Sequence, residues 1–352
     1  MNSALEIVNF VFDTQIVPTQ NTPPTVSLKF TAKRYRNKAG QRLDPADSAL
    51  TLLFVHGVGY HKESWEPCIE VIFQHFNADK AKAKLTEIRE AWAIDWQDHG
   101  DAALLNRQAL RARGDQGIQP NELAVALSTF VNSPHVKGHI LVGIAYSLGS
   151  AGLLLSVGNG TGNAQTYCSL VLIDPIVLTK ELYHNDLQYQ ATSKFLIKGA
   201  KTRRDAWPSK DIASAWLSKR FPWSGWDPRF LRSFVEHGLE QTPDDVRLKC
   251  DKKHEVSSYS PSEGIFEAAK AFSRICHNMP IHVIWGETPD LTSKDMRAAL
   301  SDASQVGVTA SVSVVPDTGH MVLPQHPNAV AHIICGILDQ TQSALISKRA
   351  KL

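Results

Sequence analysis

The stretch from Gly138 to Ile173 constrains the fold more than any other part of the chain, because it contains no Asp, Glu, Lys or Arg. Its apolar run approaches the roughly 20 residues that a membrane-spanning helix requires. Glycine and serine interrupt the run at short intervals, and a buried strand, a sharp turn and a buried helix account for the same residues. We therefore predict a strand–turn–helix unit within a protein core, and no membrane span.

Strand and helix signals alternate along most of the remaining chain. The first two strands read as an antiparallel pair, and the later strands are apolar runs separated by segments with helical spacing. Such alternation is typical of an α/β fold with a mostly parallel, doubly wound sheet that helices cover on both faces. The predicted strands cover residues 5–13, 26–35, 50–55, 91–95, 139–146, 168–174, 281–286 and 311–316. The predicted helices cover residues 66–76 and 122–131, follow Ser147, and close the chain.

The alternation stops at Asp174 and resumes only with the strand that begins at Ile281. The residues between them are polar, prone to form helices and rich in tryptophan. We interpret this segment as a helical lid inserted into one domain rather than as a second domain. The predicted core comprises residues 1–178 and 276–352, and the predicted cap comprises residues 179–275.

Ser147 is the central residue of the sequence A-Y-S-L-G, which joins the apolar strand to the apolar helix. A nucleophile elbow has this context, because a strained turn lifts a serine hydroxyl above the sheet and small flanking residues avoid a clash. The first position of the pattern is usually glycine, and alanine keeps that position small. A serine merely packed in a small-residue turn is the alternative, but we predict that Ser147 is a nucleophile.

A serine nucleophile needs a base and hydrogen-bond donors for an oxyanion. The sequence H-G-V-G follows a buried strand, so we predict that the Val58 N–H faces the oxyanion beside the Leu148 N–H. His320 follows the last strand and a glycine, in a loop that returns to the edge of the sheet where Ser147 lies. Among the 14 histidines we therefore predict His320 as the base.

Three carboxylates are candidates for the acid that orients this histidine. Asp174 ends the strand after the elbow, whereas Glu287 and Asp290 follow the next predicted strand. The common spacing places the acid three residues after Gly286, where this chain has Pro289. This offset and the buried strand before Asp174 favour Asp174, and Asp290 and Glu287 stay open as alternatives.

The motifs resemble those of α/β-hydrolases, and the resemblance extends over the whole chain. V-H-G-V-G-Y-H-K-E-S-W-E-P, A-Y-S-L-G, L-V-L-I-D-P and the terminal A-K-L are similar to fungal peroxisomal hydrolases of secondary metabolism. That group includes toxin-biosynthesis hydrolases and the acyl-CoA hydrolase of mycophenolic acid biosynthesis. The resemblance implies a triad of Ser147, Asp174 and His320, with Val58 and Leu148 as oxyanion donors, and it suggests a homodimer. H-K-E-S-W-E-P is the more group-specific stretch, but no chemical role follows from it.

The predicted lid carries an uneven charge. Residues 194–232 contain ten Lys or Arg against three Asp, which is a local charge of +7 in a chain whose formal charge is +2. Such cations can bind the phosphates of an acyl-CoA while the interleaved tryptophans and phenylalanines line an acyl passage, although a solvated helical face has the same composition. The residues that we predict to bind this substrate are Lys201, Arg203, Arg204, Trp207 and Trp223.

Composition excludes several other classes of protein. The near-zero charge argues against a general nucleic-acid binder, which needs a cationic excess. Five cysteines without a C-x-x-C pair suggest reduced thiols and no zinc knuckle, and we expect neither a metal nor a cofactor. Ala350-Lys351-Leu352 is similar to the S-K-L signal, which predicts a peroxisomal location and the import receptor as a partner.

The sequence thus predicts a serine hydrolase that passes through an acyl-enzyme, with acyl-CoA thioesters as its first class of substrate. Carboxylic esters and lactones are the alternative substrates, because the same catalytic groups serve each of them. A receptor, scaffold or non-hydrolytic cyclase on the same fold is the alternative from another functional class.

Overall fold

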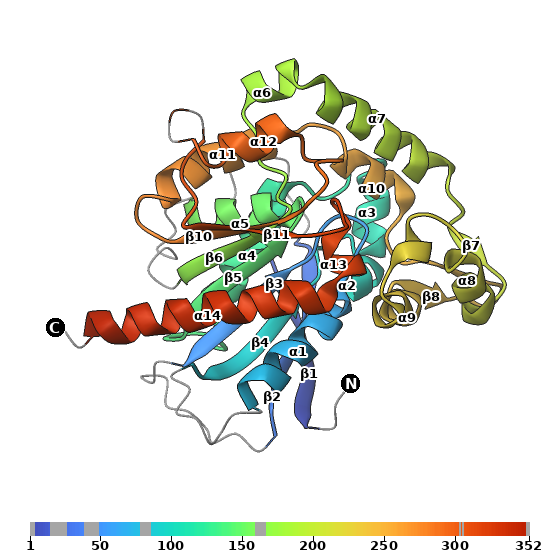
Figure 1. Cartoon of the computed structure of the whole chain (residues 1–352). Helices are drawn as coiled ribbons and strands as arrows, with labels where there is room; N and C mark the ends of the chain where they lie inside the picture. Colours follow the sequence, from blue (N-terminus) through green and yellow to red (C-terminus); the bar gives the residue numbers. More distant parts are fainter. Residues whose placement is uncertain are drawn as a thin grey trace.

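The computed structural model describes residues 4–349, except for 15–26, 39–48, 78–85, 159–166, 303 and 305 (Figure 1). The predicted signal at residues 350–352 lies outside the described residues. The described chain contains a central sheet of eight strands, a smaller sheet of three strands, and helices around both.

The central sheet has the strand order β1-β2-β4-β3-β5-β6-β10-β11. β1 pairs antiparallel with β2 and β2 pairs antiparallel with β4, whereas every other neighbouring pair is parallel. The predicted mostly parallel sheet, with its antiparallel first pair, is confirmed. The strands are β1 (Leu5–Asp13), β2 (Lys29–Asn37), β3 (Leu50–Val55), β4 (Ile88–Ile94), β5 (Ile140–Tyr146), β6 (Tyr167–Ile173), β10 (Ile281–Gly286) and β11 (Ser311–Val315).

The burial of each strand follows its sequence pattern. All residues of β3 and β10 are buried, which matches their continuous apolar runs and requires packing on both faces of the sheet. The edge strand β11 instead alternates between exposed and partly buried side chains until Val315. Helices therefore cover the middle of the sheet, while its edge is open to solvent on one side.

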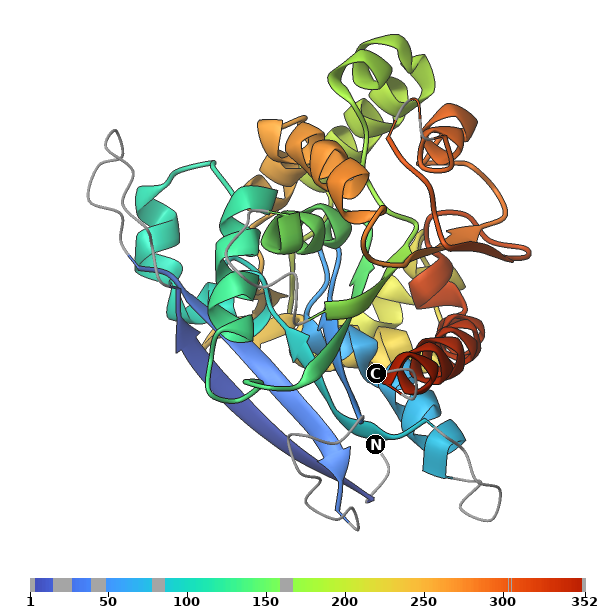
Figure 2. The same ribbon diagram turned by 90° about the vertical axis from the view of Figure 1, so that its left-hand side faces the viewer.

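Two helical layers enclose the sheet (Figure 2). One hydrophobic core joins the sheet to α4 (Pro120–Val131), α5 (Gly149–Gly158) and α11 (Glu263–Ile275). A second core on the other face joins it to α1 (Glu66–Asn77) and α14 (Pro327–Arg349). Short helices fill the connections: η1 (Lys62–Trp65), α2 (Gly100–Leu105), α3 (Arg107–Ala112), α12 (Lys294–Ala299) and α13 (Val322–Gln325).

The closing helix α14 is long and apolar enough to cross a membrane by length and composition, and within the described chain it is the only helix of that kind. Its buried side chains, which include Val330, Ile334 and Leu338, belong to the hydrophobic core shared with α1. In this structure α14 is therefore a core helix of the domain.

The segment predicted as a helical lid differs from that expectation in two ways. It contains a three-stranded antiparallel sheet in the order β7-β9-β8. In addition, α11 lies within the predicted range 179–275 but packs beside α5 over the central sheet. Its buried Ile265 and Phe272 belong to the hydrophobic core that the sheet shares with α4 and α5. The cap that remains consists of α6 (Lys180–Asn185), α7 (Leu187–Thr202), β7 (Ala206–Trp207), α8 (Lys210–Leu217), η3 (Trp223–Gly225), α9 (Pro228–His237), β8 (Leu239–Gln241), β9 (Val246–Leu248) and α10 (Lys252–Ser258).

Candidate active site

Ser147 lies in the sharp turn between β5 and α5. Its φ of 54° is in the left-handed region, which costs energy in a residue other than glycine and is typical of a functional turn. Two glycines let the chain pass close to this turn. A Cβ on Gly57 would lie 2.9 Å from the Cβ of Ser147, and a Cβ on Gly149 would lie 2.4 Å from the carbonyl oxygen of His56. Close approach of the backbone therefore requires glycine at positions 57 and 149, in addition to the serine at position 147.

His320 reaches Ser147 from the loop after β11. Its Nε2 atom lies 3.0 Å from Ser147 Oγ. The hydroxyl of Tyr146 donates a hydrogen bond of 2.7 Å to the carbonyl oxygen of His320, and the two rings stack with centroids 5.4 Å apart. Tyr146, the residue just before the serine, therefore positions the histidine. This role was not predicted from the sequence, because the contact joins residues far apart in the chain.

The carboxylate that meets the ring of His320 is that of Asp174. Asp174 Oδ1 lies 2.8 Å from His320 Nδ1 and also accepts the hydroxyl of Thr292 at 2.8 Å. Its Oδ2 accepts the backbone N–H of Gly286 at 3.0 Å. Burial by itself would raise the pKa of Asp174, but the hydrogen bonds from His320 and Gly286 and the nearby charge of Arg297 hold that pKa below its usual range. An ionised Asp174 accepts a hydrogen bond from the Nδ1–H of His320, which leaves Nε2 unprotonated and able to accept the proton of Ser147.

The two other candidate acids lie elsewhere in the same region. Asp290 Oδ1 accepts the backbone N–H of His320 at 2.8 Å, so this carboxylate holds the loop rather than the imidazole. Glu287 accepts the backbone N–H of Asp317 at 3.1 Å. The structure thus brings Ser147, His320 and Asp174 into one hydrogen-bonded chain and leaves Asp290 and Glu287 outside it.

The two predicted oxyanion donors flank the serine. Val58 and Leu148 both line the cavity that contains Ser147. Within the described chain, neither backbone N–H donates to another protein group, so both are available to a ligand. The neighbouring Gly59 has a φ of 81°, and its N–H donates to His99 Nε2 at 3.0 Å. This bond anchors the loop that carries Val58.

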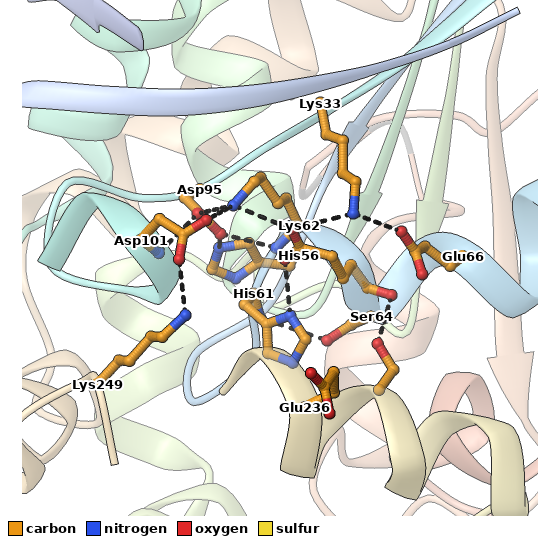
Figure 3. Close-up of polar contacts among 12 residues, drawn as sticks. Lys33, His56, His61, Lys62, Ser64, Glu66, Asp95, Asp101, Glu236 and Lys249 are labelled. Carbon is orange, nitrogen blue, oxygen red and sulfur yellow. Dashed lines mark hydrogen bonds and ion pairs between the residues drawn. The ribbon is translucent and has the colours of Figure 1, made fainter. Parts of the chain in front are cut away.

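A buried ionic cluster supports the other end of that loop (Figure 3). The Nζ atom of Lys62 lies 2.9 Å from Asp95, 2.7 Å from Asp101 and 3.1 Å from Glu63. The backbone N–H of Lys62 donates to the same Asp95 carboxylate at 2.7 Å. Burial by itself would lower the pKa of Lys62, but the three carboxylates together raise it above its usual value.

The same cluster joins the loop to the cap. Lys249, next to β9, lies 2.6 Å from Asp101 (Figure 3). The hydroxyl of Ser233 on α9 donates to the carbonyl oxygen of Glu63 at 2.9 Å. His61 Nδ1 lies 3.1 Å from the Glu63 carboxylate. The H-K-E-S-W-E-P stretch, which suggested no chemistry by itself, thus ties the oxyanion loop to the sheet and to the cap.

An apolar cavity of about 270 Å³ opens beside Ser147. The cap contributes one wall through α7, the start of the loop after α8, and the end of α10. The core contributes the loops that carry the serine and the histidine. The lining residues are Val58, Tyr60, Tyr146, Ser147, Leu148, Ile176, Tyr189, Thr192, Ser193, Phe195, Leu196, Phe221, Ser258, Tyr259, Asp290, Leu291, His320 and Met321.

None of the five lid residues predicted to bind substrate is among the residues that line this cavity, and their role in binding stays a prediction. Trp207 is buried in the core of the cap, and Trp223 packs near Trp216 with ring centroids 6.0 Å apart. The guanidinium of Arg203 pairs with Glu255. The aromatic side chains stabilise the cap itself, which sequence composition cannot distinguish from lining a passage.

The two remaining cations of that group are exposed at the surface. Lys201 is near the end of α7, and the guanidinium of Arg204 lies 5.9 Å from the centroid of the Trp207 ring and donates to the carbonyl oxygen of Ala206. The cationic composition of the lid is therefore mainly a property of its outer surface.

Comparison with known proteins agrees with this geometry. Residues 52–333 match the model of the alpha/beta hydrolase family, and the chain therefore belongs to that family of hydrolytic enzymes. Among curated proteins, it is 26% identical over 222 residues to a type I acyl-CoA thioesterase of Penicillium brevicompactum and 25% identical over 221 residues to one of Penicillium roqueforti. The matches cover 61% of this chain but 45% of each thioesterase, so the chain spans less than half the length of these relatives.

Solved structures share the fold at low sequence identity. A peroxisomal alpha-beta-hydrolase of Saccharomyces cerevisiae matches with a TM-score of 0.73 and 16% identity, covering 99% of this chain and 97% of that one. The thioesterase domain from the curacin biosynthetic pathway matches with a TM-score of 0.58 and 12% identity, covering 92% of this chain and 99% of the domain. The predicted α/β-hydrolase fold is confirmed.

Proposed function

We propose that this protein is a serine hydrolase that cleaves acyl thioesters, with acyl-CoA as the first class of substrate. The observation that carries the proposal is the hydrogen-bonded chain from Ser147 through His320 to Asp174 at one side of an apolar cavity. The same constellation supports acyl transfer on unrelated folds, because it combines a nucleophile, a base and an orienting acid.

The reaction follows from the positions of these groups. Ser147 Oγ attacks the carbonyl carbon while its proton moves to His320 Nε2, and the Val58 and Leu148 N–H groups receive the negative charge on the oxygen. The carbon–sulfur bond then breaks, and the thiolate takes the proton from His320. Water next attacks the acyl-enzyme as His320 accepts its proton and returns it to Ser147 Oγ, which releases the carboxylic acid. Asp174 holds the imidazole and stabilises its cation.

The cavity and the relatives support a thioester with an apolar acyl group. The walls present side chains such as Ile176, Leu196 and Leu291, which favour an acyl chain over a polar substrate. The curated relatives are named as acyl-CoA thioesterases. Esters and lactones are the second candidates, because the triad and the oxyanion donors act on the carbonyl group that these substrates share.

Release of free thiol from a series of acyl-CoAs tests the choice of substrate. We expect thiol release to rise above background with wild-type protein and to disappear in Ser147→Ala. If every acyl-CoA is inert while p-nitrophenyl esters or lactones are turned over, the thioesterase assignment fails and the esterase alternative replaces it. A folded protein that turns over none of these substrates points instead to the receptor or cyclase alternative.

A peroxisomal location belongs to the same proposal. It is supported by the similarity of Ala350-Lys351-Leu352 to a peroxisomal signal and by the peroxisomal structural relative. A fluorescent protein fused ahead of residue 1 should colocalise with a peroxisomal marker and become diffuse when residues 350–352 are removed. Equal distribution of the two fusions would contradict the proposed signal.

A further inference from the structure

The cap bears the most exposed large apolar side chains in the described part of the chain. Phe221 is 77% exposed, Leu187 76% and Phe195 65%. All three belong to the cap, and Phe195 and Phe221 line the cavity from two separate segments. Exposed apolar groups that gather at one place mark a surface that is covered when the protein functions.

The outer face of α7 combines these apolar groups with positive charge. Leu187, Ala191, Lys194, Phe195 and Lys198 are exposed, and their spacing of three and four residues places them along one side of the helix. α7 contains no Asp or Glu. Neither lysine forms an ion pair with any described residue. Phe195 also lines the cavity together with residues of α7 that are less exposed, so this helix connects the outer face to the site.

The loop after α8 also combines positive charge with an exposed apolar side chain that lines the cavity. Lys219, Arg220 and Phe221 are consecutive and exposed. The guanidinium of Arg220 lies 4.2 Å from the centroid of the Trp216 ring, which leaves its charge at the surface. We define the mouth face as Leu187, Lys194, Phe195, Lys198, Lys201, Lys219, Arg220 and Phe221.

We propose that the mouth face docks on an anionic lipid surface, with Leu187, Phe195 and Phe221 inserted at the level of the headgroups and the five cations against lipid phosphates. Amphipathic surfaces with aromatic or leucine side chains among lysines bind membranes in this way. Docking would place the opening between Phe195 and Phe221 against the lipid, so that an acyl chain reaches Ser147 without crossing water.

Two other occupants fit the same face less well. A second copy of this chain would bring its own five cations against these five, and like charges oppose such pairing. A soluble phosphate or the phosphates of CoA would use the cations but leave the three apolar side chains exposed. A lipid surface of negative charge satisfies both kinds of group.

Flotation with vesicles tests the proposal on the full-length protein. We expect binding to vesicles that mix phosphatidylcholine with phosphatidylglycerol and no binding to phosphatidylcholine alone. Lys194→Gln/Lys198→Gln should weaken binding roughly 20-fold, and Phe195→Ser/Phe221→Ser should abolish it. Lys137→Gln and Val314→Ser change an exposed cation and an exposed apolar group far from the cap in sequence, and serve as matched controls. Ser147→Ala should bind like wild type, which separates docking from hydrolysis.

Unchanged melting temperatures will show that these exposed substitutions leave the fold intact. The proposal is overturned if wild-type protein does not float with anionic vesicles, or if the control variants lose as much binding as the mouth-face variants. The proposal is also overturned if Lys194→Gln/Lys198→Gln loses vesicle binding while Phe195→Ser/Phe221→Ser keeps it. Binding would then depend on charge alone, as expected of a site for soluble phosphate. A concentration-dependent mass in sedimentation that Phe195→Ser/Phe221→Ser abolishes would show that a second copy covers the face.

Discussion

Replacing Lys62 tests whether the buried ionic cluster stabilises the fold and positions the oxyanion loop. Lys62 is 1% exposed and contacts three carboxylates, of which Asp95 is fully buried and Glu63 nearly so. Removing one partner of a buried pair costs about 3–5 kcal/mol, because the remaining charge stays out of water. Asp95 keeps the hydroxyl of Thr31 and two backbone N–H groups as donors, so we expect the Lys62→Met loss to fall near the lower limit.

Lys249→Met is the matched control because Lys249 contacts the same Asp101. That carboxylate is about half exposed, and a pair of this kind is worth less than about 1 kcal/mol. Equilibrium urea unfolding of the two variants measures the difference directly. Lys62→Met should also lower kcat by roughly tenfold, a fraction of the 10²–10³-fold effect of removing a whole oxyanion donor. Equal free energies of unfolding for the two variants would refute the reasoning.

Three further predictions concern the groups around His320. Asp174→Asn should lower kcat by about 10³-fold or more, because the imidazole loses the acceptor that fixes its tautomer, whereas Asp290→Asn should lower it far less; the reverse order in a kinetic comparison would reassign the acid. Tyr146→Phe removes one hydrogen bond to the His320 carbonyl and should reduce kcat by about tenfold with little change in KM. An unchanged kcat would show that Tyr146 does not position His320. The folded-state pKa of Asp174 is depressed, so its stabilising effect is present above the unfolded pKa of about 3.9 and is lost as the pH falls through the folded pKa. The gap in unfolding free energy between wild type and Asp174→Asn should therefore narrow below about pH 4, and a gap that stays constant from pH 7 to pH 3 would contradict the assigned hydrogen bonds.

Most of the sheet could be predicted because its signals are local. The run from Leu50 to Val55 is a strand at the predicted residues, since a short apolar segment that ends in a glycine-containing turn is typical of a strand buried on both faces. The A-Y-S-L-G turn is likewise encoded by residues adjacent in sequence. The small sheet of the cap was missed because β7, β8 and β9 are only two or three residues long.

The choice among the acids needed the structure. Asp174 and Asp290 both follow strands at the same edge of the sheet, and both carboxylates contact His320, one at the ring and one at the backbone. Sequence spacing places both in the right region, but only the path of the loop decides which carboxylate meets Nδ1. Tyr146 was missed for the same reason, because its partner lies in a distant loop.

The amino-acid composition of the lid did not predict where its individual side chains lie. Its tryptophans and phenylalanines were expected to line an acyl passage and its cations to bind the phosphates of acyl-CoA, but composition does not say which way a side chain points. Trp207 is buried inside the cap, and Lys201 is exposed on its outer surface. The phenylalanines of the lid agree with the expected acyl passage, because Phe195 and Phe221 line the cavity.

Labelling with a fluorophosphonate probe measures directly whether Ser147 is an activated nucleophile, the property on which the proposed hydrolase depends. Peptide mass spectrometry of labelled wild-type protein should place the adduct on Ser147, and Ser147→Ala of unchanged fold should carry none. Loss of labelling in His320→Ala would show that the base activates the serine. Folded wild-type protein that resists the probe, or Ser147→Ala that is labelled as strongly as wild type, would contradict the central claim.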